Sequence, residues 1–540
     1  MRRRAIFLLV AAAKLDAQSV QEPLRVTARL VEVSVVAEDK NGRPVAGLTR
    51  DDFTLRDGNR PETIAFFSIE SSRPPSPPRA MPPNVFTNRI EEASGGAAGA
   101  TVILFDGLNT RLVDQAYARR QILDFLGGLK PGERAAIYVM GRGPRLLQDF
   151  TADVSALTRA LESYQGGHPP SLEASLYDPS LSSAAHFGSW LGELNFNLYD
   201  TFERDRGYRT IRALVAIANH LERLPGRKNL IWVAGSFPIW LGEDSVPVPR
   251  KGARPQGNVH PELERLARAL GRANVAVYPV DARGLMAPQQ YRADRAEAGP
   301  DTSLADQGML TMMRMLAGRT GGRAFYHNND LAAAMRRAAD DSRLTYLLGY
   351  YPSHNDWDGR FREIKVEVNR PGVELLYRRG YFAQAGEPPE PWYREKVMDA
   401  AVWSPVDSTG IALTVAVRPA PPGAIDLDVQ IDAKDVSFRE KDGRWECALD
   451  LWLVQLDAKD NQAATAARTN NLRLDPETYQ RVMAVKGLAL RERVTLAPGA
   501  LLVRVLVRDL VSGALGSVTV PLKRGQPDLP HFSEKGAGSG

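Results

Sequence analysis

Cysteine is almost missing from this sequence, since Cys447 is the single one among 540 residues. One cysteine excludes an internal disulfide, a zinc finger, a Cys-ligated cluster and a CxxC redox site. The residues around it, Trp445-Glu446-Cys447-Ala448-Leu449, alternate as in a β-strand. We therefore expect Cys447 to be a small buried hydrophobe and not a reactive thiol.

An excess of one charge sign is also missing. The chain has 69 Lys+Arg and 64 Asp+Glu, a net charge of +5, and the two signs are interleaved along it. Charge therefore gives no case for nucleic-acid binding. With 44% hydrophobic and 25% charged residues, the composition is that of a soluble globular protein and excludes a coiled-coil rod, a collagen or a fully disordered chain.

The common catalytic patterns are missing as well. The sequence has no P-loop, no strand-linked GxGxxG, no HExxH and no GxSxG. None of its seven histidines stands three or four residues from another, so no helix face offers a histidine pair to a metal. We expect His220 to be a helix-surface or half-buried residue. The chain is predicted to be no enzyme and to need no cofactor.

The N-terminus reads as an export signal. Arg2, Arg3 and Arg4 precede nine apolar residues at 5–13, which is too short to span a bilayer as a helix. We predict a signal peptide at 1–17 and an exported, periplasmic or extracellular protein; a buried N-terminal helix is the alternative. No cysteine follows the apolar run, so a lipoprotein anchor is excluded, and no later stretch is long and apolar enough to cross a membrane.

The length of 540 residues predicts three or four domains at about 150 residues each. The central region alternates continuous apolar runs with helical patterns, which predicts a mostly parallel sheet covered on both faces. β-branched residues and turns dominate both flanking regions. The predicted division is: a small antiparallel β module at 24–70, a Pro/Ser/Gly linker at 71–99, an α/β domain at 100–383 with a β extension at 342–383, an immunoglobulin-like β-sandwich at 392–525, and a disordered tail at 526–540.

Within the α/β domain, the predicted elements have clear limits. The apolar runs are at 101–105, 135–140, 229–234 and 275–280, with a short strand at 323–326. Helical patterns cover 112–127, 197–224, 260–272, 304–318 and 329–341. Trp232 falls inside a central strand and is expected in the core.

The most informative motif follows the first parallel strand: Asp106-Gly107-Leu108-Asn109-Thr110. Open α/β sheets bind ligands at the carboxyl ends of their strands. Carboxylate and hydroxyl oxygens there suit a hard divalent cation. The alternative is that Asp106 caps the following turn with its own side chain.

Several segments resemble the von Willebrand factor type A-related exported proteins of Acidobacteria over residues 24–383. The resemblance implies a von Willebrand A-like, Rossmann-like open sheet with helices on both faces, and a role in protein binding. The segments that carry it are Asp39-Lys40-Asn41-Gly42-Arg43-Pro44-Val45 with Leu48-Thr49-Arg50-Asp51-Asp52-Phe53, residues 104–110, residues 224–232, residues 277–284, residues 316–322, and residues 346–350 with Arg379-Gly380-Tyr381.

The resemblance also implies a metal-ion-dependent adhesion site of the pattern Asp-x-Ser-x-Ser, completed by a Thr from a second loop and an Asp after the fourth strand. Asp106 matches the first position and Thr110 the fifth, whereas Leu108 cannot ligate. The fourth strand is followed by Gly235-Ser236 with no acid, and Thr210 is a weak candidate for the second loop. We expect a degenerate site in which Asp106, Asn109 and Thr110 bind Mg²⁺, Mn²⁺ or Ca²⁺ weakly at best.

The sequence thus predicts an exported, non-enzymatic protein-binding or scaffold protein whose partner is another protein. One alternative is a metal-dependent adhesion module. A second is a hydrolase that uses Asp106 and Asp281 at the same sheet edge, where Asp281 either pairs with Arg283 or forms part of a polar site. The aromatic-rich stretch 164–208 either covers the core or offers anchors to a partner.

Overall fold

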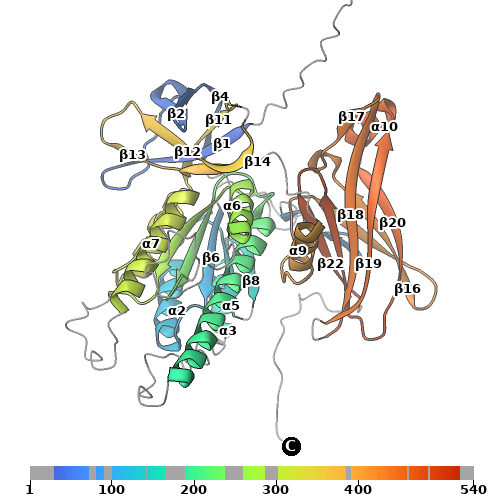
Figure 1. Cartoon of the computed structure of the whole chain (residues 1–540), viewed down its shortest axis with the longest axis horizontal. Coiled ribbons are helices and arrows are strands. Elements are labelled where there is room, and N and C mark those ends of the chain that lie inside the picture. The colour runs from blue at the N-terminus through green and yellow to red at the C-terminus, as the bar shows by residue number, and fades with distance from the viewer. Residues whose placement is uncertain are drawn as a thin grey trace, which may run out of the picture.

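The computed structural model describes residues 30–71, 81–90, 100–141, 143–164, 189–237, 260–285, 302–354, 356–384, 391–458, 461–484 and 487–522. The predicted signal peptide (1–17) and tail (526–540) lie outside these residues. Three bodies are visible in Figure 1: a central α/β unit, a β-sandwich at one end of it, and a second β-sandwich beside it. No helix in the described part is long and apolar enough to cross a membrane.

The α/β unit contains the predicted, mostly parallel sheet. Its strand order is β10-β9-β6-β7-β8, with β8 antiparallel at one edge. Every residue of the four parallel strands is buried, which explains why these strands are continuous apolar runs in the sequence. The strands are β6 (Ala100–Asp106), β7 (Ala135–Met140), β8 (Pro144–Thr151), β9 (Lys228–Ala234) and β10 (Val275–Asp281).

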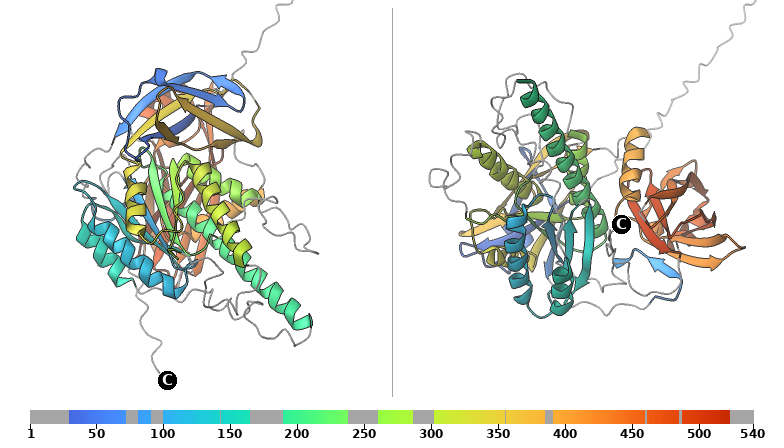
Figure 2. Two further views of the ribbon diagram at one scale, coloured as in Figure 1. Left: turned by 90° about the vertical axis from the view of Figure 1, so that its left-hand side faces the viewer. Right: turned by 90° about the horizontal axis from the view of Figure 1, so that it is seen from below.

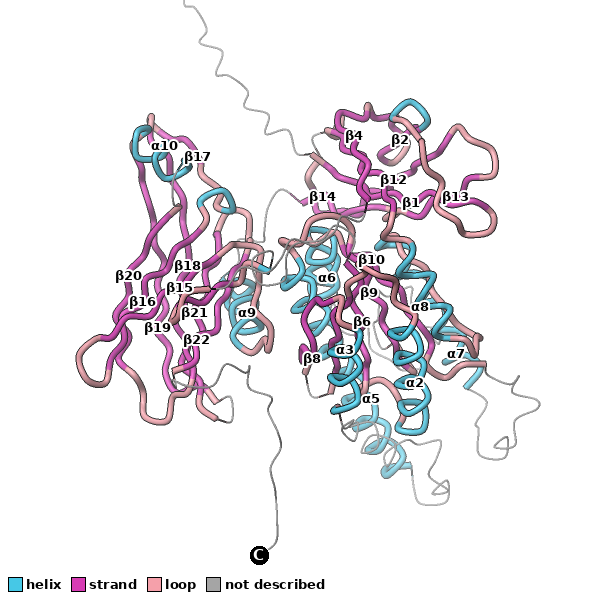
Figure 3. Tube along the Cα trace, turned by 180° about the vertical axis from the view of Figure 1, so that it is seen from behind, coloured by secondary structure: helices cyan, strands magenta, loops and turns pink. Residues whose placement is uncertain are grey.

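Helices cover both faces of this sheet, as predicted (Figure 3). Alternate strand residues enter two separate cores, one with α5, α6 and α7 and the other with α2, α3 and α8. Helix α2 has the predicted bounds, and the expected strand at 323–326 is reduced to one bridge between Val280 and Phe325. The helices are α2 (Leu112–Gly127), α3 (Val154–Ser163), α5 (Ser189–Leu221), α6 (His260–Arg272), α7 (Thr302–Thr320) and α8 (Leu331–Asp340).

The N-terminal strands and the strands after α8 form one sandwich, which corrects the predicted separate module at 24–70 and extension at 342–383. One sheet has the order β13-β1-β11-β4 and the other β14-β12-β2-β3, and Figure 2 shows blue and yellow strands interleaved. The strands are β1 (Val31–Asp39), β2 (Phe53–Asp57), β3 (Arg60–Glu62), β4 (Ile64–Ser71), β11 (Leu344–Tyr350), β12 (Asp358–Val368), β13 (Val373–Leu376) and β14 (Gly380–Gln384); a 3-10 turn, η1, covers Arg50–Asp52.

The strand pairing explains why local sequence patterns did not predict this sandwich. Strand β1 lies between β11 and β13, and Val31 pairs with Tyr350. The shared core takes Val33 and Val35 from the first segment and Tyr346 and Leu348 from the second. The α/β unit is therefore inserted between β4 and β11.

Residues 392–525 contain a second two-sheet sandwich, as predicted; its immunoglobulin-like type remains a prediction. One sheet has the order β20-β16-β15-β5, in which β5 (Val85–Thr87) comes from outside this range. In the other sheet β18 pairs with β17, β19 and β21, and β21 pairs with β22. The elements are α9 (Pro391–Val402), β15 (Leu413–Pro419), β16 (Ala424–Ile431), η4 (Ala433–Asp435), β17 (Arg439–Lys441), β18 (Arg444–Leu456), β19 (Gln462–Leu474), α10 (Pro476–Ala484), β20 (Leu488–Thr495), β21 (Leu502–Asp509) and β22 (Leu515–Pro521). Cys447 is buried in its core, as expected, and burial raises the pKa of its thiol to about 12.

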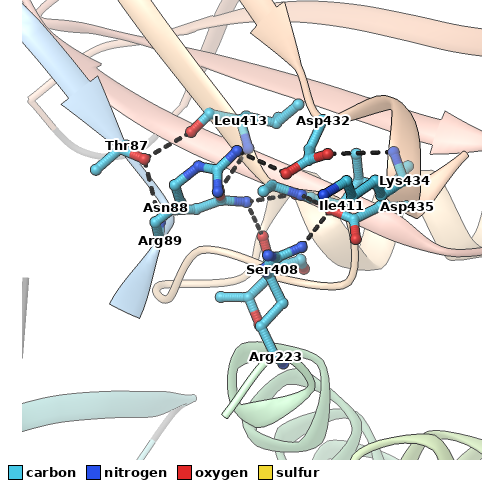
Figure 4. A network of polar contacts seen from close by, with 12 residues as sticks. Thr87, Asn88, Arg89, Arg223, Ser408, Ile411, Leu413, Asp432, Lys434 and Asp435 are labelled. Atoms are coloured by element: carbon cyan, nitrogen blue, oxygen red, sulfur yellow. Dashed lines mark hydrogen bonds and ion pairs between the residues drawn. The ribbon is translucent and has the colours of Figure 1, made fainter. Parts of the chain in front are cut away.

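Part of the predicted linker 71–99 is a structural strand, which corrects its assignment as a plain connection. Strand β5 (Val85–Thr87) pairs with β15 at the edge of the C-terminal sandwich and appears in light blue beside it in Figure 2. The Asn88 amide donates to the backbone oxygens of Ser408 and Ile411 at 2.7 and 2.8 Å and accepts from Leu413 N at 2.7 Å (Figure 4).

The end of α5 fastens the α/β unit to the same sandwich. Thr409 Oγ1 donates to the backbone oxygen of His220 at 2.9 Å, and Arg223 forms an ion pair with Asp435 (Figure 4). The His220 ring is buried, with Nδ1 2.6 Å from the backbone oxygen of Asp407. His220 is therefore a packing residue at a domain junction and more buried than the sequence indicated.

Three consecutive buried polar residues, Arg227, Lys228 and Asn229, stabilise the amino end of the parallel sheet. Arg227 donates to Tyr278 at 2.9 Å and to the backbone of Gly321, Lys228 Nζ donates to Leu224 O at 2.7 Å, and Asn229 Nδ2 donates to Ala338 O at 2.6 Å. Among the backbone acceptors, Leu224 and Gly321 follow α5 and α7, and Ala338 lies in the last turn of α8. The start of β9 thus satisfies carbonyl groups near three helix ends that would otherwise be buried without donors.

We predict that Asn88→Ala loosens the C-terminal sandwich, because the buried Leu413 N–H loses its acceptor. The cost of such a group is about 1–3 kcal/mol, and each 1.4 kcal/mol is about tenfold in the opening equilibrium. Cys447 should therefore react with a thiol reagent about tenfold faster, or more, under native conditions. Asn471→Ala, at an exposed position on β19, is the control and should leave the rate unchanged; an unchanged rate in Asn88→Ala contradicts the role of β5.

Candidate functional site

The candidate site lies at the carboxyl end of β6, where the chain order of the strands reverses. From β6 the chain continues to β7 on one side, and β9 lies on the other side. Such a switch point is where open α/β sheets place their ligands. The sequence located Asp106 there correctly, since it is the last residue of β6.

The Asp106 carboxylate is fully buried and accepts three N–H groups. Asn109 N donates to Oδ1 at 2.9 Å, Asn109 Nδ2 donates to Oδ2 at 2.7 Å, and Trp232 Nε1 donates to Oδ2 at 2.8 Å. Two of these donors come from the turn that Asp106 caps, as the alternative interpretation of the motif predicted. The third comes from β9, so the carboxylate joins two neighbouring strands.

The Thr110 hydroxyl is also fully engaged. It donates to the backbone oxygen of Asp106 at 2.5 Å and accepts from Gly235 N at 3.0 Å. Ser236 Oγ donates to Asn109 O at 3.3 Å. A side chain at Gly235 would place a Cβ 3.3 Å from the same Asn109 oxygen, so glycine allows the loop after β9 to close on the motif.

Helix α5 supplies the remaining contact. Asn109 Nδ2 donates to Thr210 Oγ1 at 2.9 Å, which places Thr210 beside the motif as the weak sequence candidate suggested. Arg206, one turn earlier, donates to Ser236 Oγ at 2.9 Å. Leu108, at the third motif position, is buried in the core instead of facing the site.

Burial raises the pKa of Asp106 from 3.8 to about 6. The hydrogen bonds from Asn109 and Trp232 and the charge of Arg206 act in the opposite direction but do not cancel it. A carboxyl group removed from water favours its neutral form. The site therefore holds its acid at a free-energy cost that its donors only partly offset.

This arrangement does not fit a bound cation. A metal needs lone pairs from several oxygens, whereas the Asp106 oxygens accept N–H groups and the Thr110 hydroxyl points its proton at a carbonyl. Asn109 Oδ1 is the one buried side-chain oxygen of the motif without a partner. Among the described residues, no group of three or more His, Cys, Asp or Glu side chains is placed to hold a metal.

Asp281, the second acid at this edge, ends β10 and is also fully buried. Arg283 Nε and an Arg283 terminal nitrogen each donate to it at 3.0 Å, and so does the Arg283 backbone N–H. Asp281 therefore forms an ion pair with Arg283 within a turn, which is the first of its two predicted roles; the other was part of a polar site. Neither Asp106 nor Asp281 offers the hydrolase alternative a free carboxylate.

Exposed apolar side chains lie at the same edge of the sheet as the buried polar motif. Leu112 and Val113 begin α2 just after the motif, and Leu285 follows the turn after β10. Their exposed fractions are 38%, 74% and 62%. We call these three residues the apolar rim.

The sequence analysis missed the two side chains that organise the motif. Trp232 was assigned to the core, which is correct, but its indole N–H also binds Asp106. Gln115 is buried, and its amide donates to Gly107 O at 3.1 Å and to Thr110 O at 2.8 Å. Of the aromatic stretch 164–208, Tyr164 packs edge-on against Phe105 and Tyr208 is exposed; residues 165–188 and the side chains of 189–204 lie outside the described part.

No protein-family model and no curated protein matches this chain. Solved structures similar to it include BatB of Bacteroides thetaiotaomicron, with 14% identity, 45% of this chain and 96% of that chain covered, and a TM-score of 0.23. The vWF domain of the type V pili tip protein Mfa5 of Porphyromonas gingivalis is 12% identical, with 44% of this chain and 93% of that chain covered and a TM-score of 0.26. A von Willebrand factor type A protein of Catenulispora acidiphila is 11% identical, with 85% of this chain and 74% of that chain covered and a TM-score of 0.23. Values this low carry no inference about function, and the description of the fold rests on the sheet itself.

We predict that Asp106 makes stability fall as pH rises. Its folded pKa of about 6 lies above the ordinary 3.8, so its contribution is complete below about pH 4 and is lost as pH rises through 6. Two pKa units correspond to about 3 kcal/mol. Urea unfolding of the wild type, compared with Asp106→Asn between pH 4 and 7, should show a steeper decline for the wild type. Parallel curves for the two proteins contradict the burial argument. The pKa of Asp341 is also raised to about 6, but its effect on stability cancels in the comparison because both proteins contain Asp341.

We also predict that divalent cations do not stabilise the protein. A ligand at 100 times its dissociation constant adds about 2.7 kcal/mol to the native state. Thermal unfolding in EDTA and in excess Mg²⁺, Mn²⁺ or Ca²⁺ should therefore give the same midpoint. A rise with one cation that Asp106→Ala abolishes contradicts this expectation and restores the metal-dependent alternative.

Proposed function

We propose that this chain is an exported, non-enzymatic binding protein built on a von Willebrand A-like domain, and that it holds a protein partner without a cation. The mixed sheet with helices on both faces supports the domain assignment. The charged and apolar N-terminal pattern supports export. The observation that carries the proposal is the buried, fully hydrogen-bonded Asp106 beside the exposed apolar rim.

The buried motif supports a cation-independent mode of binding. A cation-dependent site presents open coordination positions to a partner's carboxylate, whereas the Asp106 oxygens are occupied by donors of Asn109 and Trp232. A partner must then be held by ordinary surface complementarity. The motif serves instead to fix the start of α2 and the loop after β9, which present the surface.

The apolar rim supplies that surface. Val113 and Leu285 are the most exposed large apolar side chains identified in the described part of the α/β unit. Large apolar side chains grouped at an exposed edge mark interaction sites more often than scattered ones do. Arg111 beside Leu112 adds a mostly exposed guanidinium, paired with Asp114 at 3.0 Å, as part of a polar border.

We predict that the double variant Val113→Asp, Leu285→Asp loses its partner while remaining folded, because both side chains are mostly exposed and their replacement leaves the core intact. The full chain would be immobilised and exposed to an envelope extract of its source organism in EDTA. A specific partner should be retained by the wild type and bound at least tenfold more weakly by the variant, since burying one large apolar side chain contributes about 1.5–3 kcal/mol.

Ile69→Asp is the control, because Ile69 is also exposed, at 50%, but lies on β4 of the N-terminal sandwich. It should retain the partner at the wild-type level. Retention that requires Mg²⁺, or that is equal in the rim variant, contradicts the proposal.

A further inference from the structure

Strand β19 (Gln462–Leu474) is the longest strand at an open sheet edge in the part of the chain that the structure describes. It pairs with β18 without a bulge from Leu474 opposite Trp445 to Ala464 opposite Gln455, and no described strand pairs with its other side. One row of its backbone N–H and C=O groups is therefore left for a further strand. In Figures 1 and 3, α9 and β22 lie on the side of this sandwich that faces the α/β unit, and β19 lies farther from that unit.

Most of β19 adds little to the core of its own sandwich. Opposite the buried Leu451 of β18, it places the half-exposed Arg468, which pairs with Glu492 of β20. The residues of β19 that pack against the core, Leu472 and Leu474, lie at its end. Residues 463–467 are alanine and threonine. The strand is thus held mainly by its backbone pairing with β18, and its short side chains leave that backbone accessible from the open edge.

Two other edge strands of the sandwiches have features that discourage pairing with another chain. Strand β20 contains Arg491-Glu492-Arg493, and β3 has three residues, one of which is Pro61. Charged side chains, proline and short length are common protections of a sheet edge. Strand β19 contains no proline and no acidic residue, and its two arginines are paired within the chain, Arg468 with Glu492 and Arg473 with Glu446 at 3.2 Å.

The sequence of β19 is complementary to itself in an antiparallel pair. A two-fold axis at Ala467 places Thr465 opposite the partner's Thr469 and Arg468 opposite the partner's Ala466. An axis at Arg468 would give a slightly longer overlap, but it would oppose two guanidinium groups. Threonine pairs stabilise neighbouring strands, whereas like charges directly opposite each other destabilise them. The register at Ala467 is therefore the longest one without opposed like charges.

This symmetry favours a second copy of the chain over a strand of different sequence. The charges of β19 are already paired within the chain, so they give no preference for an acidic or a basic peptide. A two-fold antiparallel pair uses the same edge of both copies and leaves no edge of β19 for a third, so the assembly closes as a dimer. Main-chain hydrogen bonds supply the affinity in this mode of strand addition.

We propose that β19 pairs with β19 of a second copy of this chain, antiparallel and centred on Ala467, and thereby joins the β18-containing sheets of two copies into one. The dimer does not use the apolar rim, which lies on the α/β unit, and it is independent of the proposed protein-binding function. Each dimer presents two apolar rims.

The test is sedimentation equilibrium of the full chain over a range of concentrations. Ala467 is exposed, so Ala467→Lys and Ala467→Asp leave the core intact, and each variant opposes like charges across the two-fold axis. An equimolar mixture of the two variants opposes charges of opposite sign instead. Ala489→Lys, at an exposed alanine on β20, is the matched control.

The proposal expects a dimer of the wild type and of Ala489→Lys, at least tenfold weaker association of Ala467→Lys and of Ala467→Asp alone, and recovery of the dimer in their mixture. Recovery in the mixture also shows that the two variants are folded. A wild type that sediments as a monomer at every concentration overturns the proposal. It is equally overturned by a dimer that both Ala467 variants leave unchanged, by a mixture that stays monomeric, or by loss of the dimer in Ala489→Lys.

Discussion

A carboxylate without access to water must find its hydrogen-bond donors inside the protein, and this requirement organises the centre of the molecule. Asp106 takes donors from its own turn and from Trp232 on the neighbouring strand. The same turn then holds the loop after β9 through Thr110 and Gly235. The strand end, the start of α2, α5 and the following loop are therefore fixed by one buried charge and its neutral partners.

The hydrogen bonds that satisfy Asp106 disfavour cation binding at this edge of the sheet. A cation at the switch point would compete with the N–H groups of Asn109 and Trp232 for the lone pairs of Asp106. The protein gains a rigid edge and gives up an open coordination site, and the exposed side chains that remain there are apolar. Leu108, within the same motif, packs its side chain into the core and does not face a ligand.

The two ends of the α/β unit are built differently. Its carboxyl end presents loops and the apolar rim, whereas its amino end is joined to the N-terminal sandwich. Arg227, Lys228 and Asn229 bind backbone oxygens near three helix ends there, and Asn274 donates to Ser34 of β1 at 2.8 Å. With β5 and the end of α5 fastening the C-terminal sandwich, the three bodies are held by hydrogen bonds from short segments.

The sequence by itself determined the elements whose patterns are local. Apolar runs such as 101–105 and 229–234 marked the buried parallel strands, the 3.6-residue period of 112–127 set α2, and an acid after a strand located Asp106. Only the tertiary structure decided which distant groups meet. The pairing of Val31 with Tyr350, the addition of β5 to β15, and the bond from Trp232 to Asp106 join residues far apart in the chain. Periodicity reports which face of an element is buried, but the partner of that face depends on how the whole chain packs.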